Sequence, residues 1–199
     1  AARLETGETT IDLLAGDLVL AGSAASLVAS STLGSIASVT TIGPGDAVLR
    51  AGDCQFKTKR YADALAYYNE AVNKQYDGFE YALYQKAIIR GLQGSQLDKA
   101  VALESLVDRY PNSRYADESL LELGNTYLEM GKLSEATTPL RRLVSDYRGK
   151  SPLINQALMQ LGIISFRQGN YTAAANYYKQ VFFINDKATK EKYTLSLLQ

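Results

Sequence analysis

The chain has 199 residues, of which 46% are apolar and 21% are charged, a balance typical of folded proteins rather than disordered ones. Basic and acidic residues number 21 each, so no net charge attracts nucleic acid. There is no histidine and only one cysteine, Cys54, which excludes an internal disulfide and most zinc or non-haem iron sites. We therefore expect no cofactor, no metal and no nucleic-acid partner, and we interpret Cys54 as a buried, inert thiol.

Residues 1–45 differ in composition from the rest of the chain. No charged residue occurs from Leu18 to Gly45, and small and β-branched residues dominate. Gly16 lies 36 residues before Gly52, a spacing that favours a degenerate first hairpin with helices over about residues 9–21 and up to residue 38. Two alternatives stay open, which are an irregular or strand-like appendage and a membrane or targeting segment.

Three later stretches share one pattern, in which a Gly is followed 12 positions later by Ala and 16 positions later by a large apolar residue. The Gly residues are at 52, 124 and 162, and the large apolar residues are Tyr68, Leu140 and Tyr178. A weaker copy has Ala87 in the Gly position, followed by Gly94, Leu97 and Ala100. Positions 52, 87, 124 and 162 are 35, 37 and 38 residues apart, which predicts a series of helical hairpins of about 36 residues each.

Turn signals lie at the points where this reading requires them. Met130-Gly131-Lys132 and Gln168-Gly169-Asn170 separate the two helices within a hairpin, and segments 109–113 and 148–152 separate one hairpin from the next. Glycine and proline stop one helix and allow the next to begin, so these segments predict the helix boundaries.

This pattern resembles the tetratricopeptide repeat family over about residues 46–185. The resemblance implies an all-α fold, a right-handed α-solenoid of four clear hairpins with a possible fifth in residues 1–45, followed by a C-terminal helix over residues 186–199. The linker Tyr110-Pro111-Asn112-Ser113 is similar to that of bacterial envelope members of the family, and the second linker, 148–152, departs from it. We therefore expect a periplasmic or outer-membrane-associated location, with a cytoplasmic one as the alternative.

In this family the first helix of each hairpin lines a concave face that binds peptides or partner helices. Positions counted from each Gly predict a partner-binding face, much of it apolar and aromatic. The candidate residues are Leu49, Asp53, Phe56, Tyr81, Tyr84, Ile88, Asn125, Glu129, Met159, Ile163, Phe166 and Arg167. Each apolar candidate could instead pack against the neighbouring hairpin. Only Asn125 matches the Lys/Asn clamp by which some members hold a chaperone's C-terminal carboxylate, so that ligand is not expected.

The function predicted from the sequence is a non-catalytic scaffold or adaptor for a protein or peptide, within a larger bacterial envelope protein or complex. A self-assembling structural module is one alternative, because Leu197 and Leu198 would leave an apolar end for self-association. An accessory domain of a cell-wall enzyme is another, although the sequence has no phosphate-binding Gly-rich loop and no nucleophile elbow.

Overall fold

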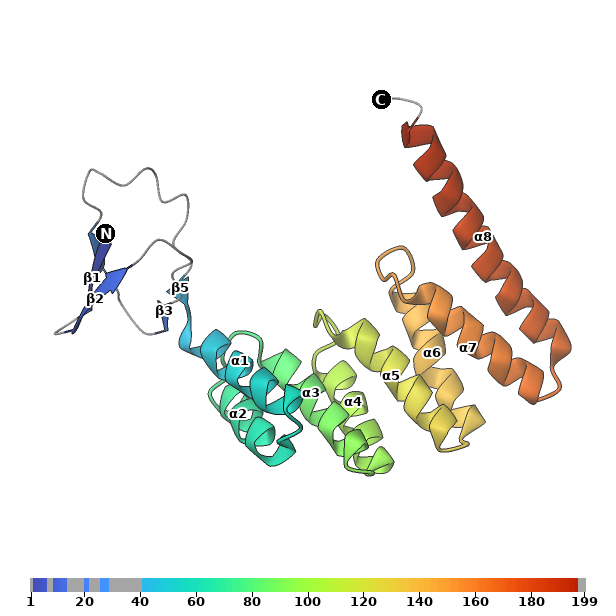
Figure 1. Ribbon diagram of the computed structural model, residues 1–199. Coiled ribbons are helices and arrows are strands. Elements are labelled where there is room, and N and C mark those ends of the chain that lie inside the picture. Colours follow the sequence, from blue (N-terminus) through green and yellow to red (C-terminus); the bar gives the residue numbers. More distant parts are fainter. Residues whose placement is uncertain (1, 7–8, 14–19, 22–25, 29–40, 197–199) are drawn as a thin grey trace. The chain divides into compact units, whose positions relative to one another are not determined.

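A computed structural model describes residues 2–6, 9–13, 20–21, 26–28 and 41–196, and it describes side chains for residues 43–182 and 184. The chain forms two compact units, Ala1–Ala82 and Leu83–Gln199. Figure 1 shows the elements of each unit, with strands in the first 42 residues and helices after them.

The described part of the N-terminal segment consists of short strands rather than a helical hairpin. Strand β1 (Ala2–Thr6) pairs antiparallel with β2 (Thr9–Leu13) and with β4 (Ser26–Val28), and β3 (Leu20–Ala21) pairs parallel with β5 (Thr41–Ile42). The helix predicted over residues 9–21 is therefore wrong where the structure describes that range. Thr9-Thr10-Ile11 is a β-branched run, which favours a strand over a helix.

Eight helices follow, paired as helical hairpins. They are α1 (Pro44–Lys57), α2 (Tyr61–Asn73), α3 (Phe79–Leu92), α4 (Gln96–Arg109), α5 (Ala116–Glu129), α6 (Leu133–Asp146), α7 (Ile154–Arg167) and α8 (Tyr171–Ser196). The starts of α1, α3, α5 and α7 are 35, 37 and 38 residues apart, the same intervals that the sequence pattern predicts. The all-α repeat fold predicted from the sequence is confirmed for the region after residue 43.

The turn within each hairpin has the same backbone geometry. Its middle residue has a positive φ and is Gly94, Gly131 or Gly169 in three hairpins, but Lys59 in the first. In each turn the middle N–H donates to the carbonyl three residues back, and the next N–H donates to the carbonyl five residues back. This is the Schellman arrangement, which satisfies the last carbonyls of the first helix and suits glycine because a left-handed residue with a Cβ is strained.

The repeated glycines allow the close approach that the sequence predicts. A Cβ added to Gly52 would lie 2.7 Å from the ring of Tyr68, and one added to Gly124 would lie 2.6 Å from Leu140. Tyr68 and Leu140 are fully buried, so the large residue packs directly on the glycine of its own hairpin. The rings of Tyr68 and Tyr81, which lies in the following helix, also form an edge-to-face pair with centroids 6.2 Å apart.

The second hairpin departs from the others by exchanging a large and a small residue. The fourth residue of the second helix is Ala64, Ala136 or Ala174 in three hairpins, but Lys99 in this one. Opposite it, Gly91 replaces a large apolar residue, and a Cβ there would lie 2.5 Å from the Lys99 side chain. Leu97 and Ala100, assigned as repeat marks from the sequence, are thus one position out of register. Gln96 and Lys99 hold the equivalent places.

Helix α8 continues through residue 186, where the sequence reading placed a boundary before a separate terminal helix. Leu197 and Leu198, on which the self-association alternative depends, lie outside the described residues. Within the described part of the chain, no helix combines the length and hydropathy needed to span a bilayer.

Candidate functional site

The first unit uses its predicted binding residues largely for its own packing. Leu49 is only 7% exposed, and its side chain lies against Gly78, so its assignment to an open binding face is wrong. Asp53 accepts hydrogen bonds through one carboxylate oxygen from the hydroxyls of Tyr68 (2.8 Å) and Tyr81 (2.6 Å). Phe56 is half-buried, with its ring 5.9 Å from that of Tyr61.

The Asp53 network ties the first hairpin to the helix that follows it. Burial, and then the hydrogen bond to Asp53, raise the pKa of the Tyr68 hydroxyl well above its usual value. A protonated tyrosine donates to the carboxylate, whereas a tyrosinate would be repelled by it. Asp53 and Tyr81 therefore connect elements within this unit, and no sequence pattern distinguishes this role from partner binding.

In the second unit, Tyr84 of α3 stacks on Tyr115, with ring centroids 6.1 Å apart and planes tilted by 20°. Burial raises the pKa of Tyr84 to about 12, and the negative charges of Glu122 and Glu118 add to the effect. The ammonium group of Lys99, itself buried, donates to the carboxylate of Glu122 and so joins α4 to α5. Ile88 is half-buried on α3, so this part of the predicted face is only partly open.

Helix α5 presents one exposed and one covered candidate. Glu129 is exposed at the end of the helix. The Oδ1 atom of Asn125 is buried by neighbouring protein atoms and has no hydrogen-bond partner in the described structure. An unpaired buried amide oxygen is destabilising, but it is closed to a ligand in this rotamer.

Helix α7 carries the most open part of the predicted face. Met159 is 43% exposed and Phe166 is 58% exposed, and Ile163 lies between them on the same side of the helix. The ring of Phe166 also meets Tyr171 edge-on at 5.2 Å. Arg167 is exposed beside this group. The opposite side of α7 is buried in the core of the unit through Ala157, Leu158, Leu161 and Ile164.

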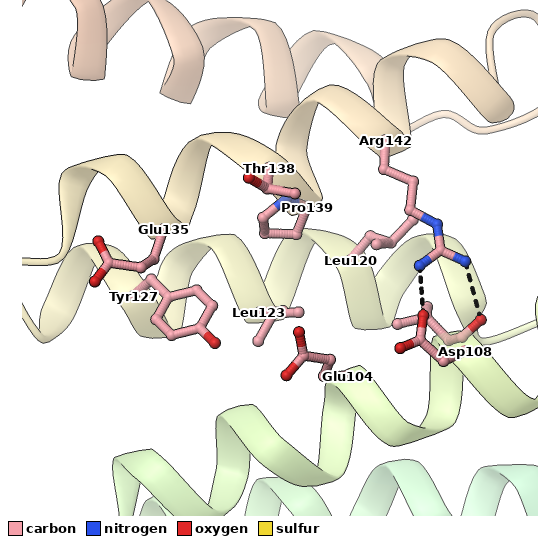
Figure 2. Close-up of a pocket in the computed structure, with 10 residues that line it drawn as sticks. Glu104, Asp108, Leu120, Leu123, Tyr127, Glu135, Thr138, Pro139 and Arg142 are labelled. Carbon is pink, nitrogen blue, oxygen red and sulfur yellow. Dashed lines mark hydrogen bonds and ion pairs between the residues drawn. The ribbon is translucent and has the colours of Figure 1, made fainter.

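A second feature, which the sequence analysis missed, is a cleft between α4 and α6 whose floor is α5. Its volume is about 230 Å³, and its lining includes Leu120, Leu123 and Pro139 (Figure 2). At one end Arg142 donates to the carboxylate of Asp108 (2.7 Å) and to the carbonyl of Val107 (3.2 Å). The other end holds Tyr127 and Glu135, and Glu104 lies between Tyr127 and the Arg142–Asp108 pair. These residues come from three helices, so only the register of the hairpins could have shown that they meet.

One sequence expectation about a single side chain is contradicted. Cys54 is exposed, so its interpretation as a buried thiol is wrong. The reason is that Cys54 lies on the side of α1 away from the residues that pack against α2. Among the described residues, no group of three or more His, Cys, Asp or Glu side chains is arranged to hold a metal ion.

The repeat geometry agrees with a comparison against protein families. The tetratricopeptide repeat model matches residues 43–82 and 121–184, and a second model of the same description matches residues 81–113. The chain belongs to the tetratricopeptide repeat family. The matched stretches include part of every one of the four hairpins, and they leave out the first residues of α5 and the part of α8 after residue 184. No curated protein sequence matches the chain.

Solved structures with a similar fold are also tetratricopeptide proteins or resemble them in architecture. MamA superposes with a TM-score of 0.58 at 16% identity, over 73% of this chain and 81% of MamA. A tetratricopeptide repeat protein from Parabacteroides merdae superposes with a TM-score of 0.61 at 16% identity, over 72% of this chain and 54% of that one. The Rap conjugation gene regulator of the plasmid pLS20, in complex with the Phr* peptide, superposes with a TM-score of 0.50 at 21% identity, over 69% of this chain and 41% of the regulator. At these identities the likeness concerns the fold.

Proposed function

We propose that this tetratricopeptide repeat chain is a non-catalytic adaptor that binds a protein or peptide on α7, along the exposed stripe of Met159, Ile163 and Phe166. The observation that carries this proposal is that α7 has apolar residues on two opposite sides. The core uses only one of these sides, which it buries through Leu158 and Leu161. A helix whose only role is to pack against the protein core would carry polar residues on its solvent-facing side.

The side chains of this α7 stripe suit a binding surface. Burying apolar area stabilises a complex by about 25 cal/mol per Å², and aromatic and methionine side chains are enriched at the centres of interfaces. Arg167 and Glu129 are exposed and charged, which suits residues at the rim, where charge sets orientation and association rate rather than affinity. The peptide complex of the structurally similar Rap regulator supports a peptide as the class of ligand.

The test is a selection of displayed peptides on the immobilised chain, followed by affinity measurements with single variants. We expect Met159→Ser and Phe166→Ser each to weaken binding of the selected peptides by about tenfold, which corresponds to about 1.4 kcal/mol. Phe182→Ser is the matched control, because Phe182 is an exposed aromatic residue of α8 outside the stripe. Binding that survives both α7 variants, or that falls equally in the control, would refute the assignment.

We further propose that the chain acts in the bacterial envelope, as part of a larger protein or complex. The support is the linker Tyr110-Pro111-Asn112-Ser113, which resembles that of envelope members of the family. In this chain the linker is held by a hydrogen bond from the Tyr147 hydroxyl to the Pro111 carbonyl (2.6 Å). Fractionation of cells that express the natural gene product tests the proposal, and recovery in the cytoplasmic fraction alone would contradict it.

A further inference from the structure

The cleft lined by α4, α5 and α6 is a different surface from the α7 stripe. On α5, Leu120, Leu123 and Tyr127 line the cleft, whereas Asn125 and Glu129 belong to the predicted binding face. At 3.6 residues per turn, these two sets lie on opposite sides of the helix. A partner in the cleft would therefore leave the predicted face of α5 open.

Two carboxylates that line the cleft around Tyr127 have no partner within the described part of the chain. Neither Glu104 nor Glu135 makes a hydrogen bond or ion pair with another described residue. Burial raises the pKa of Tyr127, and the charges of Glu104 and Glu135 raise it further, so both carboxylates act on the same phenol. Pro139 lies one turn after Glu135 and has no N–H, so the Glu135 carbonyl lacks its usual helical donor. Carboxylate oxygens of Glu104 and Glu135 thus flank Tyr127 in a partly apolar cleft, and the Glu135 carbonyl lies on the same helix as one of them.

Arg142, the only basic residue among those that line the cleft, does not neutralise these two carboxylates. Arg142 is held at the far end by the Asp108 carboxylate and the Val107 carbonyl, as Figure 2 shows. It also lies 3.7 Å from the Asp146 carboxylate. The negative charge of Glu104 and Glu135 is therefore complementary to a cation that comes from outside the chain.

An exposed apolar pair continues the cleft along α4. Leu97 is 57% exposed and Val101 is 56% exposed, and they precede Glu104 by seven and three residues, so all three share one side of the helix. The equivalent positions of the other second helices hold small or polar residues, namely Ala62 and Ala66, Ser134 and Thr138, and Thr172 and Asn176. We call Leu97 and Val101 the α4 ledge. No requirement of the repeat fold accounts for it.

We propose that the cleft and the α4 ledge dock an amphipathic helix of a partner protein, which lays aliphatic side chains on Leu97 and Val101 and inserts an arginine between Glu104 and Glu135. Leu97 and Glu104 are separated by about 10.5 Å along α4, the length of two turns, so a helix packed alongside matches the spacing. Arginine fits better than lysine for two reasons. Its planar guanidinium can pair with a carboxylate through two hydrogen bonds and donate to a carbonyl, and it stacks on a tyrosine ring such as that of Tyr127.

The probe is an alanine-based peptide of about 16 residues, since shorter isolated helices are marginal, with two leucines four residues apart and an arginine three residues further on. Its binding to the full chain is measured by fluorescence anisotropy beside two matched peptides that carry lysine or glutamine in place of the arginine. The chain is tested unchanged, with Glu104→Gln and Glu135→Gln combined, with Val101→Ser, and with Glu129→Gln as a control carboxylate on the other side of α5.

We expect the arginine peptide to bind at least about tenfold more tightly than the glutamine peptide, with the lysine peptide between them. The combined glutamine variant should abolish that difference, and Val101→Ser should weaken all three peptides alike. Equal binding of the arginine and glutamine peptides, or an equal loss in Glu129→Gln, would overturn the proposal. Met159→Ser and Phe166→Ser should leave this binding unchanged, so the test is independent of the α7 stripe.

Discussion

The exchange of Gly91 and Lys99 predicts a strong energetic coupling between these two positions. In the other hairpins a large residue, Phe56, Leu128 or Phe166, stands in the place of Gly91, and an alanine stands in the place of Lys99. In the second hairpin the Lys99 stem fills the space that glycine leaves, and its ammonium group reaches Glu122. Restoring the usual residue at only one of the two positions should therefore destabilise the fold, and restoring both should cost less than the two single losses together.

The magnitudes follow from the packing. Lys99→Ala removes a buried stem at about 0.8 kcal/mol per methylene and should cost roughly 2–3 kcal/mol. Gly91→Leu should cost about 1–3 kcal/mol, because a Cβ there would already lie 2.5 Å from Lys99, and better helix propensity offsets at most about 1 kcal/mol of this. In the double variant the leucine occupies the space of the missing stem. If the two single losses were additive, the double variant would lose their sum in free energy of unfolding. We expect it to lose about 2 kcal/mol less than that sum.

The assay is a double-mutant cycle by urea unfolding, followed by both circular dichroism and tyrosine fluorescence because repeat proteins can unfold in parts. Lys99→Met separates shape from charge. It keeps an unbranched apolar stem and should cost less than Lys99→Ala, since Glu122 remains partly exposed to water. Losses that add to within about 0.5 kcal/mol would show that the two positions are independent and would refute this account of the second hairpin.

Three further predictions concern single features of the fold. Lys59→Gly should raise the free energy of unfolding by about 0.5–1 kcal/mol, because Lys59 has φ 60° where the other hairpins have glycine, and an unchanged or lower urea midpoint would contradict this. Gly124→Ala should lower the melting temperature despite its better helix propensity, because its Cβ would lie 2.6 Å from the buried Leu140, and an equal or higher value would contradict the close approach. Because the pKa of Tyr84 is raised in the folded state, the protonated Tyr84 hydroxyl stabilises the fold fully below about pH 10, the ordinary pKa of tyrosine. This contribution is lost as the pH rises toward about 12. Tyr84→Phe should therefore flatten the alkaline fall in stability measured by urea unfolding, and an unchanged slope would contradict the assignment.

The repeat could be predicted from the sequence because its signals are local and recur. Gly131 and Gly169 mark turns by their backbone freedom, and the spacing of the small residues gives the helix starts at the observed intervals. The second hairpin was read one position out of register because Ala100 resembles the expected alanine more than Lys99 does. A buried lysine paired with a glycine is a compensating exchange, and no single-position pattern reveals it.

The candidate sites were predicted less completely, for a physical reason. Periodicity shows which side of a helix a residue occupies, and this placed Met159 and Phe166 correctly on the side away from the core. It could not show that Leu49 is covered or that Asp53 accepts two tyrosine hydroxyls, because those facts depend on contacts between different helices. The prediction for the N-terminal segment was wrong for a related reason. It relied on the spacing of 36 residues between Gly16 and Gly52, although the β-branched residues of that segment favour strands.

The central claim is that the α7 stripe is the recognition surface, and site-specific photo-crosslinking tests it most directly. A photo-reactive phenylalanine analogue is placed at Phe166 in one sample and at Phe182 in another, and each chain is expressed in its native host and irradiated. We predict a defined crosslinked partner from position 166 that Met159→Ser diminishes, and none of the same mass from position 182. A partner crosslinked equally from both positions, or from position 182 alone, would contradict the claim.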